Sequence, residues 1–251
     1  MKEYNILGIR VHTIPKHIIK NLLHVYLNSD QQHQIVTVNP EFIVSAQNDN
    51  KFRKIINEAS LATIDGAGII KALQFFGQPI SLDDRITGVD LTEMLLKIAV
   101  NNNNKILFCL NSRGLTKPDD FFMKIKKRYP DLDFQVADEN ILLEKADIFN
   151  PEIILVGLGA PTQDIWIWEN LSRIPSARIA VGVGGTFDFM SGRISRAPKI
   201  LRSFGLEWLW RVFRQPHRLH RINRAIFIFP YLVVKDRIKK SIKNSNNKEK
   251  L

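Results

Sequence analysis

An aspartate between a short apolar run and a helical pattern is well placed in this sequence to do chemistry. Asp65 stands in "TIDGAGII", where Gly66 and Gly68 would let a ligand approach the backbone closely. A carboxylate in that position can act as a general base on a hydroxyl group. Aspartate is also a preferred N-cap, so the pattern alone supports catalysis and helix capping equally.

Two polar side chains end the β-rich run "QIVTVNP". Thr37 and Asn39 are two positions apart, so a strand places both on one face, where they could hydrogen-bond a polyhydroxylated ligand. Asn39 could instead bond to its own turn, and the spacing alone favours that second interpretation.

Two glycine-rich turns follow later apolar runs. In "LVGLGAPTQD", Gly157 and Gly159 precede a helix start whose N–H groups would favour phosphate, and Gln163 could read a base, a sugar or a phosphate. A tight strand-to-helix turn explains this pattern equally well, because the dinucleotide fingerprint is incomplete. The second turn, "VGVGGTFDFMSGR", contains Gly184, Gly185 and Asp188. Asp188 could orient a ligand or pair with an arginine, and such pairing is slightly favoured.

Positive charge is concentrated in the last quarter of the chain. Residues 1–192 contain 20 Lys and Arg against 22 Asp and Glu, whereas residues 193–251 contain 16 against 3. A basic tail on a nearly neutral body indicates an anionic partner. Within the tail, "GLEWLWRVFRQPHRLHR" combines aromatic and basic residues in the manner of a segment that lies on an anionic membrane. A solvated basic face on an ordinary packing helix is the alternative.

The elements that must position these residues alternate along the chain. Short apolar runs at 34–40, 105–110, 152–159 and 177–185 are separated by helical patterns. This alternation predicts an α/β, Rossmann-like fold, with a mostly parallel sheet and helices on both faces. Ligands bind such sheets at the carboxyl ends of the strands. We expect a catalytic domain over residues 1–195 and a helical, basic, amphipathic appendage over 196–251 with a disordered end.

Several other classes of protein are disfavoured. The six histidines are scattered and no metal-binding motif occurs, so we predict no metal and no cofactor. The single Cys109 lies in an apolar run and is expected to be a buried thiol.

Neither a signal peptide nor an apolar stretch of about 18 residues is evident in the sequence. The expected location is therefore cytoplasmic, with peripheral contact to the inner membrane face.

Six motifs in one order carry a family resemblance: "TVNPEFIVSAQND", "IDGAGIIKAL", "DRITGVDL", "VGLGAPTQDIWI", "VGVGGTFDFMSGRISRAPK" and "GLEWLWRVFRQPHR". Together they resemble the WecG/TagA/CpsF family of bacterial glycosyltransferases over roughly residues 4 to 225. The resemblance implies metal-independent, inverting transfer from a UDP-sugar to a polyprenyl-diphosphate-linked sugar. The best-known version moves N-acetylmannosamine to undecaprenyl-diphosphate N-acetylglucosamine. Relatives use UDP-N-acetylmannosaminuronic acid or other UDP-hexoses for antigen, capsule or exopolysaccharide.

The resemblance also implies roles for individual residues. Asp65 would be the general base, Thr37 and Asn39 would hold the sugar, and Arg85 would contact a phosphate or the sugar. The nucleotide pocket would be lined by Gln163, Gly157, Gly159, Gly184 and Gly185. Asp188 and Arg196 are further predicted substrate contacts. The appendage would meet a pyrophosphate through Arg214, Arg221 and Arg224, because a leaving diphosphate without a metal needs a cationic partner.

This chain departs from the family pattern at some positions. Thr162 replaces a basic residue that often precedes the glutamine, and Asp164 replaces a glutamate.

Two other classes of protein remain as alternatives. The glycine turns also suit a nicotinamide-dependent oxidoreductase, and the basic tail suits a nucleic-acid binder, although the near-neutral body argues against nucleic acid. A homo-oligomer is compatible with the sequence.

Overall fold

The computed structural model describes residues 1–195, 197–198, 201, 204–205, 209–210 and 223–248. Its centre is an eight-stranded sheet with the order β1-β2-β4-β3-β8-β7-β5-β6. β1 and β2 form an antiparallel pair, and the other strands are parallel. The strands are β1 (Lys2–Ile6), β2 (Ile9–Thr13), β3 (His33–Val38), β4 (Leu61–Ile64), β5 (Ile106–Leu110), β6 (Phe134–Asp138), β7 (Ile153–Gly157) and β8 (Ile179–Gly182).

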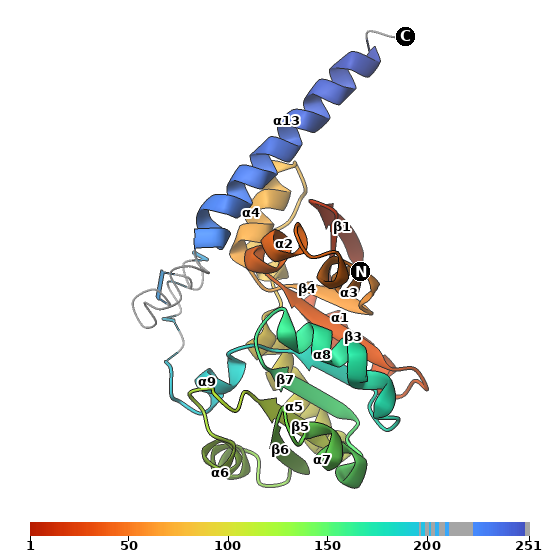
Figure 1. Cartoon of the computed structure of the whole chain (residues 1–251), viewed down its shortest axis with the longest axis vertical. Coiled ribbons are helices and arrows are strands. Elements are labelled where there is room, and N and C mark those ends of the chain that lie inside the picture. The colour runs from red at the N-terminus through yellow and green to blue at the C-terminus, as the bar shows by residue number, and fades with distance from the viewer. Residues whose placement is uncertain (196, 199–200, 202–203, 206–208, 211–222, 249–251) are drawn as a thin grey trace.

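Helices cover both faces of the sheet, because the strands are apolar on both sides (Figure 1). The first face packs against α1 (Lys16–Leu27), α5 (Gly88–Asn102), α6 (Pro118–Arg128) and α9 (Thr186–Met190). The second packs against α2 (Pro40–Ala46), α3 (Asn50–Glu58), α4 (Ala67–Phe75), α7 (Leu142–Phe149) and α8 (Thr162–Asn170). Short 3-10 turns are η1 (Leu82–Asp84) and η2 (Leu171–Arg173). The predicted α/β fold with a mostly parallel sheet is therefore confirmed.

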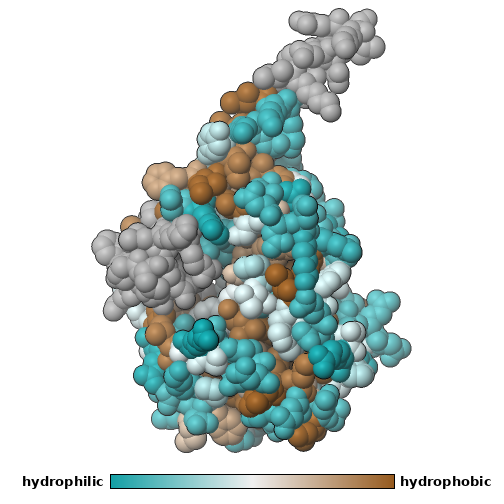
Figure 2. All heavy atoms as spheres, viewed as in Figure 1, coloured by the Kyte–Doolittle hydropathy of each residue, from teal (hydrophilic) through white to brown (hydrophobic). Residues whose placement is uncertain are grey.

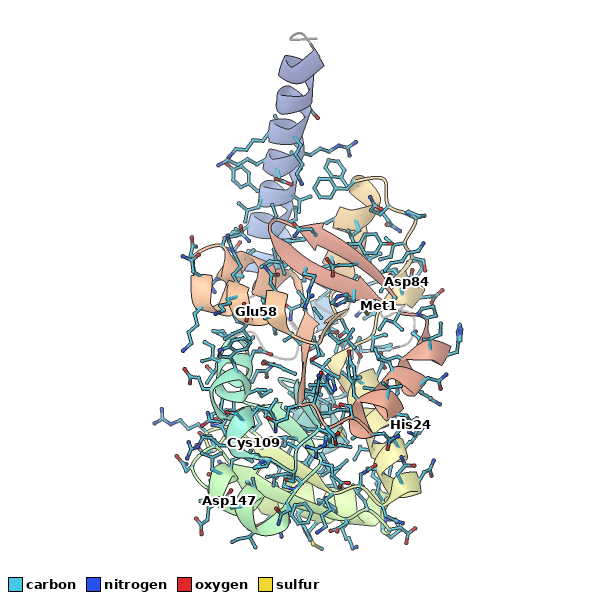
Figure 3. All side chains as sticks on the ribbon, turned by 90° about the vertical axis from the view of Figure 1, so that its right-hand side faces the viewer. Met1, His24, Glu58, Asp84, Cys109 and Asp147 are labelled. Atoms are coloured by element: carbon cyan, nitrogen blue, oxygen red, sulfur yellow. The ribbon has the colours of Figure 1, made fainter. Side chains whose placement is uncertain are left out.

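The described part of the C-terminal region contains a helix, as predicted. A π-helical turn, η4 (Arg224–Ile228), leads into α13 (Phe229–Lys248). Phe229 and Val233 are buried in the core of the second face and attach the start of α13 to the body. From there α13 extends away from the end of the body that carries β1 and β2, and Asp147 of α7 marks the opposite end (Figure 3). The helix is described as far as Lys248, and the expectation of a disordered end stays a prediction.

The apolar runs are longer than the strands that they form. The runs 152–159 and 177–185 give strands that end at Gly157 and Gly182. Gly159 and Gly184 then adopt positive φ values of 81° and 53°, which turn the chain out of the sheet. Both turns lie at the carboxyl edge of the sheet, where Asn39 and Asp65 follow β3 and β4.

Candidate active site

A cavity of about 490 Å³ lies at the carboxyl edge of the sheet, between the loops that follow β3, β4, β5, β7 and β8. This is the place where a parallel α/β sheet binds its ligands. The described lining includes nine of the residues that the sequence selects: Thr37, Asn39, Asp65, Gly157, Gly159, Gln163, Gly184, Gly185 and Asp188. Residues as far apart in the chain as Thr37 and Asp188 thus meet in one pocket.

Asp65 directly follows β4 and lines this cavity. Its backbone N–H donates to the Val38 carbonyl oxygen over 2.8 Å, which joins the ends of β4 and β3. The N-cap of α4 is Gly66, so the helix-capping interpretation of Asp65 is not what the fold uses. A Cβ on Gly66 would lie 2.4 Å from Cδ of Pro40, so this loop can pack against α2 only with glycine there.

Arg85 fixes the same loop from the other side. Its side chain is buried, and Nε donates to the Asp65 carbonyl oxygen over 2.8 Å. Arg85 is not among the residues that line the cavity. In the described structure this arginine therefore holds the backbone of Asp65, and the expected contact to phosphate or sugar stays a prediction.

Thr37 and Asn39 both have structural partners at the pocket wall. The Thr37 hydroxyl donates to the Gly182 carbonyl oxygen over 2.9 Å and so links β3 to β8. The Asn39 side-chain oxygen accepts from the N–H groups of Glu41 and Phe42 and caps α2. The turn-forming interpretation of Asn39 is thus correct. Within the described residues these bonds use only the carboxamide oxygen, so the NH₂ group can still contact a ligand.

Gln163 joins the two glycine turns. Its side-chain oxygen accepts from the Gly159 N–H over 3.1 Å and from the Gly184 N–H over 2.8 Å. Only 1% of the residue is exposed. Because these two amides already have a partner, they are not free donors for a phosphate. The glycine turns shape the pocket wall, and Gln163 keeps the two turns at a fixed separation.

Asp188 pairs with hydroxyl groups. Its carboxylate accepts from the Thr116 hydroxyl over 2.7 Å, and Thr116 also contacts the Ser191 hydroxyl at 2.9 Å. Arg193, which follows Asp188 in the sequence, forms an ion pair with Asp120 on α6. This network connects α9 to the loop after β5, and both segments line the cavity.

Comparison with known proteins identifies the family of this chain. The model of the glycosyl transferase WecG/TagA/CpsF family matches residues 4–243. The chain belongs to this family. Relatives from Staphylococcus aureus strains MRSA252 and MW2 are each 30% identical over 249 residues, which cover 95% of this chain and 96% of the relative. Both are named N-acetylglucosaminyldiphosphoundecaprenol N-acetyl-beta-D-mannosaminyltransferase.

One wall of the cavity was not predicted from the sequence. The loop after β5 contributes Asn111, Arg113 and Leu115, and Arg113 is the one cation among the described lining residues. Glu139 holds the loop by accepting from the N–H and the hydroxyl of Ser112, over 2.8 and 2.6 Å. Burial alone would raise the pKa of Glu139, but the Ser112 bonds and the Arg113 charge outweigh it and lower that pKa.

The C-terminal region contributes to the pocket of this glycosyltransferase as well. Ala197 and Trp210 line the cavity, and the Trp210 indole N–H donates to the Ser195 carbonyl oxygen over 3.0 Å. Arg224 lies in η4 and does not line the cavity. The other predicted appendage contacts, Arg196, Arg214 and Arg221, lie outside the described residues.

Membrane-spanning helices and metal-binding clusters are both absent from the residues that the structure describes. No helix in these ranges is long and apolar enough to cross a membrane. In the same ranges, no three His, Cys, Asp or Glu side chains gather as a metal-binding group.

Proposed function

We propose that this glycosyltransferase moves N-acetylmannosamine from UDP-N-acetylmannosamine to undecaprenyl-diphosphate-linked N-acetylglucosamine, with inversion and without a metal. The observation that supports it best is the meeting of Thr37, Asn39 and Asp65 at one end of a pocket of about 490 Å³. Hydroxyl and amide groups suit a sugar, and a carboxylate beside them suits an acceptor hydroxyl. The names of the relatives favour this donor and acceptor.

Asp65 is the general base of the proposed reaction. The acceptor hydroxyl oxygen attacks the anomeric carbon of the donor, and its proton passes to the Asp65 carboxylate. The bond from that carbon to the diphosphate oxygen breaks, and UDP leaves with the electron pair. A single displacement of this kind inverts the anomeric configuration. The Arg85 bond to the Asp65 backbone keeps the carboxylate in place during transfer.

Arg113 is proposed as a contact of the leaving diphosphate. Negative charge develops on UDP as the bond breaks, and a guanidinium group can bind phosphate oxygens in a bidentate manner. Arg113 is exposed and lines the cavity, so its side chain can reach a bound ligand. Arg196, Arg214, Arg221 and Arg224 stay proposals as further contacts from the C-terminal region.

Peripheral membrane association is proposed through α13. Tyr231, Val234 and Ile238 recur on it at helical spacing, and all three are exposed. Phe227, in the turn before α13, is 69% exposed. Brown hydrophobic atoms gather along the base of α13, next to hydrophilic ones (Figure 2). An apolar stripe on a helix that carries Lys235 and Lys239 suits an anionic lipid surface, where the acceptor lipid resides.

A donor panel tests the proposed substrates. Purified protein on anionic vesicles is given a short-chain analogue of undecaprenyl-diphosphate N-acetylglucosamine with UDP-N-acetylmannosamine, UDP-N-acetylmannosaminuronic acid or another UDP-hexose. We expect UDP release only when acceptor and UDP-N-acetylmannosamine are both present, and a β-linked product by nuclear magnetic resonance. Faster release with another donor would reject N-acetylmannosamine as the substrate. An α-linked product would reject inversion, since UDP-sugars of this type carry an α-linked diphosphate.

A further inference from the structure

A buried carboxyl group next to the pocket has no role in the reaction proposed above. Asp164 lies in the first turn of α8 and is 0% exposed. Neither carboxyl oxygen makes a hydrogen bond of standard geometry within the described residues, and the Gln163 amide is the side chain that partly stabilises the charge. Burial of a carboxyl group without a partner is costly, so native proteins keep such a group where it has a task.

The packing around Gly182 shows that the Asp164 carboxyl group faces the carboxamide of Gln163. A Cβ built on Gly182 would lie 2.6 Å from Oδ1 of Asp164 and 2.5 Å from Nε2 of Gln163. The carboxyl group and the carboxamide therefore face the same small space above the end of β8. Gln34, on β3, donates from Nε2 to the Asp164 backbone oxygen over 2.9 Å and fixes this turn of α8 against the sheet.

The carboxamide of Gln163 can perform its bridging role in one orientation only. Its oxygen must face the N–H groups of Gly159 and Gly184, as it does. The opposite orientation would place the NH₂ group against two N–H donors and would lose both hydrogen bonds. In the observed orientation Nε2 faces the space above Gly182, where Asp164 presents an acceptor.

We propose that Asp164 is a positioning residue, whose carboxyl group selects the Gln163 orientation that ties the two glycine turns together. The pocket wall then depends on a chain of contacts from Asp164 through Gln163 to the Gly159 and Gly184 amides. Gly182 is glycine because any side chain there would separate the two groups. The proposal rests on the proposed function only in assigning this pocket to the UDP part of the donor.

The test uses the full chain with the variants Asp164→Ala, Asp164→Leu and Asp164→Asn. UDP affinity is measured by calorimetry. We expect Asp164→Ala and Asp164→Leu to weaken UDP binding about tenfold, the loss of one buried polar contact. Leucine has the same branching at Cγ as aspartate, so it serves if alanine leaves a cavity that prevents folding. Asp164→Asn should restore most of the affinity, because its side-chain oxygen can face Nε2 of Gln163.

Two comparisons separate positioning from general loss of stability. Gln163→Ala should weaken UDP binding about as much as Asp164→Ala, and the double variant should be no weaker than either, since both changes break one chain of contacts. Leu23→Ala is a control: it opens the core under α1, a helix that contributes no residue to the cavity lining, and should lower stability with UDP affinity unchanged. Effects that add in the double variant would overturn the proposal.

Hydrogen exchange of the Gly159 and Gly184 amides gives a readout that needs no ligand. Both amides should be protected in the wild type and exchange at least tenfold faster in Asp164→Leu, but not in Asp164→Asn or Leu23→Ala. Unchanged protection in folded Asp164→Leu would refute the positioning role. If wild-type protein fails to bind UDP while the exchange result holds, the proposed function fails and the positioning role stands.

Discussion

Titration of Asp164 should make the stability of this protein depend on pH in a direction unusual for an aspartate. Burial raises the pKa of Asp164 from 3.8 to about 7, and the nearby Gln163 amide offsets part of that rise. Each pKa unit corresponds to 1.36 kcal/mol, so the charged form destabilises the folded state by on the order of 4 kcal/mol. No charged neighbour within the described residues contributes to this shift.

The sign follows from proton binding. Between about pH 4 and pH 7 the folded state binds more protons than the unfolded state, because its Asp164 pKa is the higher one. The contribution of Asp164 to stability is therefore greatest below about pH 4 and falls as the pH rises to 7. The variant Asp164→Asn cannot titrate at this position and gives the matched reference.

Urea unfolding of wild type and Asp164→Asn between pH 4.5 and pH 8 measures the effect. The free energy of unfolding of the wild type minus that of the variant should increase by about 2 to 4 kcal/mol as the pH is lowered from 8 to 4.5. Other carboxylates titrate in both proteins and cancel in the difference. A difference that stays flat, or that grows with rising pH, would refute a buried Asp164 with a raised pKa.

Three further predictions concern the pocket and α13. Gly182→Ala places its Cβ 2.5 Å from Nε2 of Gln163, so it should destabilise the fold by about 1–3 kcal/mol in thermal unfolding; an unchanged melting temperature would contradict that packing. Arg113→Ala should lower kcat/KM about tenfold or more, and Arg113→Lys should lower it less. A kcat/KM in Arg113→Ala equal to that of the wild type would show that Arg113 does not belong to the site. Ile238→Asp should weaken flotation with anionic vesicles about tenfold, whereas Asn103→Asp, on the body, should not.

The sequence predicted the parallel part of the sheet well, because strands buried on both faces read as continuous apolar runs. β5 (Ile106–Leu110) is the clearest case, since every residue in it is buried. The β1–β2 pair was missed. β1 is an edge strand with the sequence KEYNI, of which three residues are exposed, so it lacks the apolar signal.

The site was predicted in part, for reasons that differ between residues. Asp65 and Thr37 come directly from the rule that ligands bind at the carboxyl ends of strands. The same rule applied to β5 would have found Arg113, but "NSRG" resembles an ordinary turn. The bridge from Gln163 to Gly184 spans 21 positions, and the space above Gly182 depends on tertiary packing. Neither feature leaves a periodic signal in the sequence.

The most direct test of the central claim compares wild type with Asp65→Asn in EDTA. UDP release is followed with UDP-N-acetylmannosamine and the undecaprenyl-diphosphate N-acetylglucosamine analogue, and circular dichroism verifies the fold. We predict acceptor-dependent release by the wild type in EDTA and a loss of roughly 10²- to 10⁴-fold in Asp65→Asn, the usual contribution of a general base. Wild-type turnover by folded Asp65→Asn, or release that stops when EDTA is added, would contradict a metal-independent transferase with Asp65 as its base.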